Sequence, residues 1–274
     1  MEQRFVTPEP IELYVENGRG TVEITATDTA ETVVQVSGER ADEFVVEHDG
    51  HQVAVIAPKR AGGVFGRDAK AAVVVTMPAH STVVGKVGSS DLAVHGPLAH
   101  ASVDSGSGDV SLEVVEGEAE LKTGSGDVQV AALHGDTRVK SGSGDVVVKL
   151  SARSLVVSTG SGDVVVRRSA GHLAVKTGSG DVLVGESEDD VSCTTGSGDL
   201  RVDVARRGRV TVKGASGDVL LGIPQGTPVW TDITTASGRI SSDVGGAGEP
   251  AEGEDFLEVR ARTASGDITL QEQR

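Results

Sequence analysis

A short motif rich in Gly, Ser and Asp returns every 18 residues between residues 87 and 221, and this repeat constrains the fold more than any other feature of the chain. A fixed short period with a glycine-rich turn is typical of chains that stack similar coils on one another. The aspartates of the first seven copies keep the 18-residue step, and the eighth comes one residue late: Asp91, Asp109, Asp127, Asp145, Asp163, Asp181, Asp199 and Asp218.

Each repeat contains two short stretches in which apolar or small residues alternate with polar ones. With the aspartate as position zero, the apolar or small residues fall at positions +1, +3, +6, +10, +12 and +14. A spacing of two is the periodicity of a β-strand with alternate side chains facing inward, and the β-branched residues favour strands. In the repeat that starts at Asp163 these residues are Val164, Val166, Ser169, Leu173, Val175 and Thr177.

Two strands and two turns in 18 residues predict one coil of a parallel β-solenoid. A helical fold is disfavoured because glycine interrupts every segment and no 3.6-residue period is present. We therefore predict an all-β protein, a single parallel β-solenoid (β-helix) with 18-residue coils and degenerate terminal coils. We expect degenerate N-terminal coils and a cap over residues 1–86, the regular array over 87–221, and irregular C-terminal coils and a cap over 222–274.

Degenerate copies of the motif extend the pattern at both ends. Upstream, residues 17–24 keep the turn and strand with Thr21 in the place of the aspartate. Downstream copies occupy residues 214–218, 235–239 and 263–267, and their wider spacing predicts inserted loops, most clearly at 245–255. A second loop is predicted over the basic stretch 59–70. All six aromatic residues lie outside residues 66–229, so we expect a thin core of Val, Leu, Ala and Thr.

The array Ser-Gly-Ser-Gly-Asp-Val-x-Val with degenerate flanks resembles the bacterial DUF4097 family of adhesin-like β-strand repeat proteins. The resemblance covers roughly residues 10–270. It implies a β-helical, non-catalytic module, and it brings no catalytic residues with it.

The repeated aspartates admit two interpretations. In the structural one, each carboxylate accepts N–H groups of its own turn, as in Asx turns, and glycine supplies a positive φ. In the functional one, carboxylates and turn carbonyls hold Ca²⁺, as in the β-roll of RTX proteins. This chain departs from that β-roll because the other half of each coil lacks a matching motif. We favour the structural interpretation and predict no metal and no cofactor.

No set of residues predicts catalysis. The chain lacks a Gly-x-Ser-x-Gly elbow, and its seven histidines are scattered. Cys193 falls at the inward position +12, which predicts a small core side chain rather than a reactive thiol. We therefore expect a protein that is not an enzyme.

Charge and cysteine content restrict the partners and the compartment. A net charge of −16 argues against nucleic acid and anionic membranes as partners. We see neither a signal peptide nor an apolar run long enough for membrane insertion, and a single cysteine fits a reducing compartment. These features predict a cytoplasmic protein that binds a protein or a glycan.

Aliphatic residues at outward positions mark a possible interaction face. The strand that follows the aspartate carries Val147, Val165 and Leu183 at position +2, and the other strand carries Val156 and Ala174 at +11. Stacked exposed aliphatic side chains form a patch that monomers usually avoid, so either a terminal segment or a partner should cover it. We predict an interaction scaffold, with a polymerising bactofilin-like solenoid and a calcium-binding β-roll as the alternatives.

Overall fold

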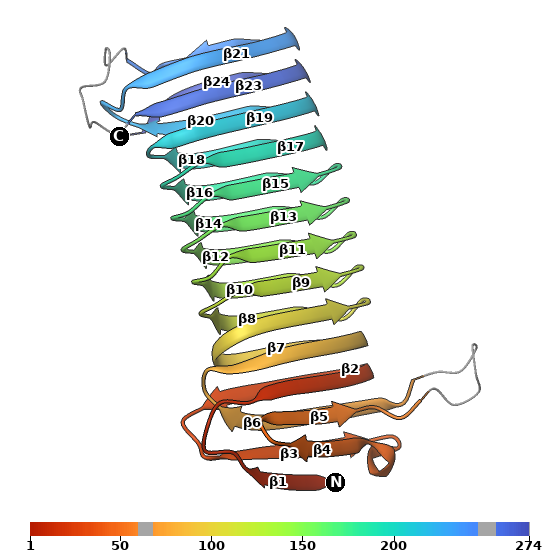
Figure 1. The fold of residues 1–274 in the computed structure, drawn as a ribbon. Coiled ribbons are helices and arrows are strands. Elements are labelled where there is room, and N and C mark those ends of the chain that lie inside the picture. Colours follow the sequence, from red (N-terminus) through yellow and green to blue (C-terminus); the bar gives the residue numbers. More distant parts are fainter. Residues whose placement is uncertain (60–67, 246–255, 274) are drawn as a thin grey trace. The chain divides into compact units, whose positions relative to one another are not determined.

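A computed structural model describes residues 1–59, 68–245 and 256–273. The predicted all-β, parallel β-solenoid with 18-residue coils is confirmed (Figure 1). The chain divides into two compact units, Met1–Asp136 and Thr137–Arg274, which are described in turn. Most of the two predicted loops, residues 60–67 and 246–255, lies outside the described residues.

Unit 1 begins with irregular strands and continues into regular coils. Its strands are β1 (Glu2–Val6), β2 (Glu12–Thr27), β3 (Glu31–Gly38), β4 (Val45–Asp49), β5 (Gln52–Ile56), β6 (Lys70–Pro78), β7 (Ser81–Ser105), β8 (Val110–Val115), β9 (Ala119–Thr123) and β10 (Val128–Leu133), with a short 3-10 helix η1 (Ala41–Glu43) before β4.

Unit 2 consists of short strands, two to each coil. They are β11 (Thr137–Ser141), β12 (Val146–Ser151), β13 (Leu155–Thr159), β14 (Val164–Ser169), β15 (Leu173–Thr177), β16 (Val182–Ser187), β17 (Val191–Ser197), β18 (Leu200–Ala205), β19 (Gly208–Ser216), β20 (Val219–Pro224), β21 (Val229–Ser237), β22 (Ile240–Ser242), β23 (Leu257–Ser265) and β24 (Ile268–Gln273).

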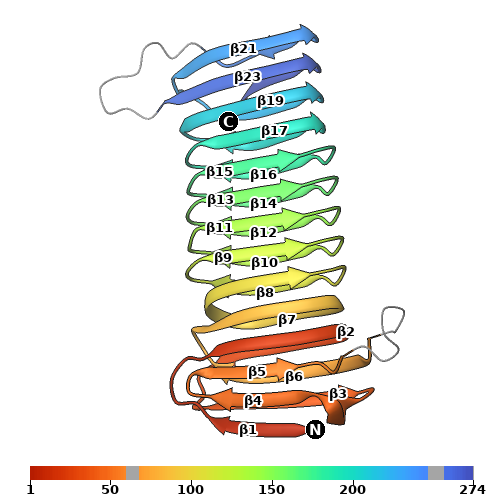
Figure 2. The same cartoon turned by 45° about the vertical axis from the view of Figure 1, so that its right-hand side comes forward.

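The strands of unit 2 form two parallel stacks that share one core. β12, β14, β16, β18, β20, β24 and β22 pair successively in one stack, and β11, β13, β15, β17, β19, β23 and β21 pair in the other (Figure 2). All six residues predicted to face inward in the coil of Asp163 are buried. The column assignment is therefore confirmed for this coil. Packing depends on identical positions meeting in register, as Val164 meets Val146 and Val182.

The N-terminal part of unit 1 departs from the parallel pattern. Strand β1 pairs antiparallel with β3, β3 with β6, and β4 with β5. The degenerate copy in β2 is nevertheless in register with the repeat, because Thr21 lies opposite Asp91 of β7. The prediction that Thr21 takes the place of the aspartate is confirmed.

The last two coils of unit 2 stack in an order that differs from their order in the chain. β23 lies between β19 and β21, and β24 lies between β20 and β22. Copy 263–267 is thus inserted between copies 214–218 and 235–239. The coil of β21 and β22, although earlier in sequence, is the terminal coil of the stack.

The second glycine of the repeated turn is required by the close approach of adjacent coils. A Cβ atom there would lie 1.9 to 2.1 Å from a carbonyl oxygen of the preceding coil, at Gly108, Gly126, Gly162, Gly180 and Gly198. None of these five glycines has a positive φ. The expectation that glycine supplies a positive φ is therefore wrong for these regular copies, and holds for the degenerate copies at Gly20, Gly217 and Gly266.

Substitution of Gly162 by alanine should destabilise the protein. The new Cβ would lie 2.1 Å from the Gly144 carbonyl oxygen, so two coils would have to separate locally. We expect a loss of about 2 kcal/mol or more in the free energy of unfolding, measured by urea denaturation. Gly214→Ala is the matched control, because its Cβ would meet only the Thr195 and Thr263 side chains at 3.6 and 3.9 Å. Equal stability of the two variants would contradict this account.

Val164 provides a test of the core. Its side chain is fully buried between Val146 and Val182. Val164→Asp would bury an unpaired charge, and we expect a loss of about 4 kcal/mol or more and no cooperative thermal transition by circular dichroism. Val165→Lys, one residue further along the strand and pointing outward, should unfold like the parent protein.

Candidate functional site

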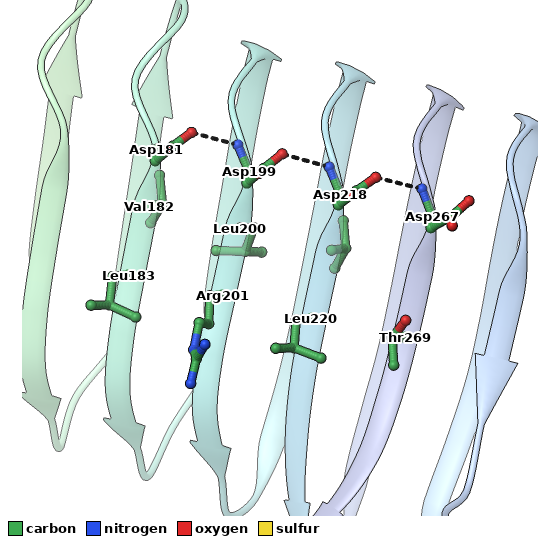
Figure 3. A pocket seen from close by; sticks show the side chains of 11 residues that line it. Asp181, Val182, Leu183, Asp199, Leu200, Arg201, Asp218, Leu220, Asp267 and Thr269 are labelled. Carbon is green, nitrogen blue, oxygen red and sulfur yellow. Dashed lines mark hydrogen bonds between the residues drawn. The ribbon is translucent and has the colours of Figure 1, made fainter.

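The repeated aspartates form hydrogen-bonded ladders along one edge of each unit. Each carboxylate Oδ1 accepts the backbone N–H of the aspartate in the following coil. In unit 1, Asp109 donates to Asp91 at 3.1 Å and Asp127 donates to Asp109 at 2.9 Å. In unit 2 the aspartate N–H groups bond at 2.8 Å to the carboxylates of Asp145, Asp163, Asp181, Asp199 and Asp218 in order (Figure 3 shows the bonds to Asp181, Asp199 and Asp218). The Asp267 carboxylate accepts the backbone N–H of Arg239, which stands in the place of the aspartate in the terminal coil, also at 2.8 Å.

The ladder differs from the expected Asx turn in the identity of the donor. The carboxylate bonds to the next coil and thereby fixes the distance and register between two coils. The side chains lie at the surface, where two unit charges about 4.8 Å apart repel by only about 0.9 kcal/mol in water. A charge-assisted hydrogen bond stabilises by a comparable or larger amount, about 1.5–3 kcal/mol. The hydrogen bonds of the ladder therefore offset the repulsion between its carboxylates.

Buried hydroxyl groups complete the same turns from the inside. The Ser105 and Ser141 hydroxyls donate to the carbonyls of Gly108 and Gly144 at 2.6 and 2.7 Å. At Thr159 the direction is reversed, and its Oγ1 accepts the N–H of Gly162 at 3.1 Å. Position +14 is thus small and polar because it holds the turn that presents the aspartate.

The described residues contain no group of three or more His, Cys, Asp or Glu side chains arranged to hold a metal ion. In the ladder, one oxygen of each bonded carboxylate already accepts a backbone N–H group. These bonds give the aspartates a structural role between neighbouring coils.

Calcium should therefore change the stability very little. A ligand stabilises the folded state by RT ln(1 + [L]/Kd), which is small when the ion concentration stays below Kd. We expect millimolar calcium to raise Tm by less than about 2 °C in differential scanning calorimetry. A rise of about 10 °C that a chelator reverses would contradict the structural interpretation.

A groove of about 540 Å³ lies on the surface of unit 2 beside the Asp ladder. It is bordered by the aspartates that directly precede β16, β18, β20 and β24, namely Asp181, Asp199, Asp218 and Asp267. Outward side chains of the same strands form its floor: Leu183, Arg201, Leu220 and Thr269 (Figure 3). The predicted aliphatic column, which starts at Val147 and Val165, runs in register into this groove through Leu183.

The five residues of the predicted interaction face belong to two faces. Val147, Val165 and Leu183 lie on β12, β14 and β16, whereas Val156 and Ala174 lie on β13 and β15. The two stacks direct their buried residues into one core, so their outward columns point away from each other. The expectation that the two columns lie beside one another is therefore wrong. All five side chains are half-buried, because neighbouring coils shield their flanks.

Cys193 lies on β17 with an exposed fraction of 1%. Burial raises the pKa of its thiol to about 12, so the reactive thiolate is scarce at neutral pH. The prediction of a small core side chain is confirmed.

A stack of 18-residue parallel coils with an Asp ladder at one edge defines the class of this protein, a repetitive β-solenoid. Within that class, the Toastrack DUF4097 family model matches residues 10–213 and 189–271. The chain belongs to this family, as the repeated motif indicated.

The solved structures that match this chain are distant in sequence. One is described as a "putative lipid binding protein" from Parabacteroides distasonis, with 13% identity over 98% of this chain and 96% of that one, at a TM-score of 0.47. Another is a "putative adhesin" from Parabacteroides merdae, with 12% identity over 100% and 96% of the two chains and a TM-score of 0.38. A "putative adhesin" from Bacteroides fragilis has 11% identity over 98% and 96%, with a TM-score of 0.35.

Such low identities and TM-scores transfer no function to this chain. No curated protein matches it. Among the residues that the structure describes, no helix is long and apolar enough to cross a lipid bilayer.

Proposed function

We propose that this protein is a non-catalytic β-solenoid interaction scaffold that binds a protein partner through the aliphatic column Val147–Val165–Leu183. The observation that carries the proposal is the register of these residues. Val165 lies directly opposite Val147 on one side and Leu183 on the other, all on outward positions of a rigid sheet. Aliphatic side chains held in a row on a rigid sheet lose little entropy on docking, which favours binding to an apolar surface.

The chemistry of the surrounding surface supports a binding role over a catalytic one. The carboxylates beside the column are engaged in the ladder, and the only cysteine is buried. The groove adjoining the column offers both aliphatic and charged side chains, as the edge of a protein interface does. A glycan partner, the other expectation, has less to bind here because this column carries no aromatic ring.

End-to-end polymerisation of the bactofilin type has weaker support. The terminal coil of unit 2 offers an edge, since within the described residues β21 pairs only with β23 and β22 only with β24. The first strands of unit 1 are antiparallel, however, and do not continue a parallel stack. Sedimentation velocity over a range of protein concentrations separates a polymer from a discrete scaffold.

Val165→Lys tests the proposed face. Because Val165 points outward, the variant should fold with a Tm close to that of the parent protein. A lysine in the middle of the column should weaken partner capture or self-association by about tenfold or more, as truncated interface centres do. Pull-down from native host lysate and light scattering on the same samples measure the two effects.

Val156→Lys is the matched control, since it places the same charge at a half-buried outward position of the other stack. This control should retain binding. Unchanged association of Val165→Lys in both assays would remove the column as the binding surface. Unfolding of Val165→Lys would indicate that the chain itself covers the column.

A further inference from the structure

In unit 2, the outer face of the stack that contains β15, β17, β19, β23 and β21 is cationic, although the protein as a whole carries a net charge of −16. The outward positions of β15, β17, β19, β23 and β21 hold five basic side chains and only two carboxylates, Glu258 and Asp232. We call this surface the basic face and define it by Lys176, Arg209, Lys213, Arg260, Arg262 and the exposed Trp230.

The basic side chains form a regular array because the strands are in register. One column runs from Lys176 through Thr194 and Lys213 to Arg262. In the adjacent columns Thr211 lies opposite Arg260, and Glu258 lies between Arg209 on one side and Trp230 on the other. Successive strands lie about 4.8 Å apart, so the positive charges repeat over a rigid surface with a short and constant step.

The two carboxylates do not neutralise this surface. Both Arg209 and Arg260 bond to Glu258, which lowers the pKa of the Glu258 carboxyl, chiefly through the hydrogen bond from Arg209. Asp232 pairs with Arg262 at 3.3 Å. Among the described residues, neither Lys176 nor Lys213 forms an ion pair, and both ammonium groups belong to exposed side chains. Positive charge therefore remains available to a ligand.

Trp230 adds a flat apolar ring to the basic face. Its exposed fraction is 52%, which is high for the largest apolar side chain, and it is the only tryptophan of the chain. The guanidinium of Arg260 lies 5.5 Å from the ring centroid, an arrangement that orients the indole by a cation–π interaction. A ring held at the surface beside cations is suited to a ligand that has both an apolar face and negative charge.

A groove of about 310 Å³ lies across the same strands, lined by Arg209, Thr211, Lys213, Arg260 and Arg262 among others. The remaining outward residues of β17 and β19 are the hydroxyl side chains of Ser192, Thr194 and Thr211. Guanidinium groups pair with carboxylates through two parallel hydrogen bonds, and hydroxyls exchange hydrogen bonds with other hydroxyls. The groove thus combines the groups that recognise a charged sugar.

We propose that the basic face binds an acidic polysaccharide, with Arg262, Lys213 and Arg260 pairing with its carboxylates and Trp230 stacking on a sugar ring. An added peptide strand is excluded on this face because β19 and β23 are each hydrogen-bonded to a strand on both sides. A lipid surface fits less well, since the outward residues of β17, β19 and β23 include no aliphatic side chain that would insert. Duplex DNA fits less well, because its bases are stacked on one another inside the helix and leave no exposed ring face for Trp230.

Binding of oligogalacturonate to the full chain, measured by isothermal titration calorimetry, tests the proposal. We expect saturable binding that weakens as salt is raised from about 0.05 M to about 0.5 M, because the exposed ion pairs are screened. Lys213→Ala combined with Arg262→Ala should weaken Kd by about tenfold or more, and Trp230→Ala by a similar factor. All these side chains are exposed, so Tm should stay near that of the parent protein.

Two control variants keep the test independent of the proposed protein-binding face. Arg167→Ala removes an exposed cation from β14 on the other stack and should leave binding unchanged, as should Val165→Lys. The proposal is overturned by an absence of saturable binding, by equal binding of neutral dextran, or by an equal loss in Arg167→Ala. It is also overturned if vesicles of phosphatidylglycerol or duplex DNA bind to the basic face more tightly than oligogalacturonate.

Discussion

The fold depends on how closely the turns of adjacent coils approach one another. At the second glycine of each regular turn, the backbone of one coil lies against the carbonyl of the coil before it, at a separation that leaves no room for a Cβ atom. The carboxylate of the aspartate one residue later bonds on the opposite side of the coil, to the backbone of the next coil. Glycine permits the approach and aspartate fixes the register, which explains why the pair Gly-Asp recurs in the regular turns.

The inward columns follow from that register. Once the turns are aligned, position +1 of one coil must lie against +1 of the next, and only side chains of similar small volume pack without gaps. Val146, Val164 and Val182 satisfy this requirement on one stack, and Leu155 and Leu173 satisfy it on the other.

The sequence alone predicted the fold class and the buried columns, because a repeat with a period of 18 residues fixes every inward position from one correct assignment. It failed where the determining contact joins two coils. The donor to each Asp lies 18 or more residues away, on a neighbour that only the stacking of coils brings close, as with Asp181 and Asp163. The exchanged order of β21 and β23 is hidden for the same reason, since each degenerate copy fits next to any other copy.

The predicted interaction face joined residues that lie on two different surfaces. The position of a residue in the repeat tells whether its side chain points inward or outward from its own strand, but not which stack that strand belongs to. Val165 and Ala174 are both outward, yet they lie on separate stacks and belong to separate surfaces. The basic face was missed because its members come from strands far apart in the chain, such as Lys176 and Arg262, and net charge conceals a local excess of the opposite sign.

Within each coil, the turn and inward positions serve folding, and the outward positions are free to serve binding. Turn and inward positions are fixed by stacking, so changes there cost folding free energy. Outward positions make few contacts that the stack requires, and they differ from coil to coil: Val165 and Leu183 are followed by Arg201, and Thr194 by Lys213. The repeat therefore does not impose the aliphatic column on one stack or the basic face on the other. Two surfaces of different chemistry on one rigid core are suited to holding two different partners at once.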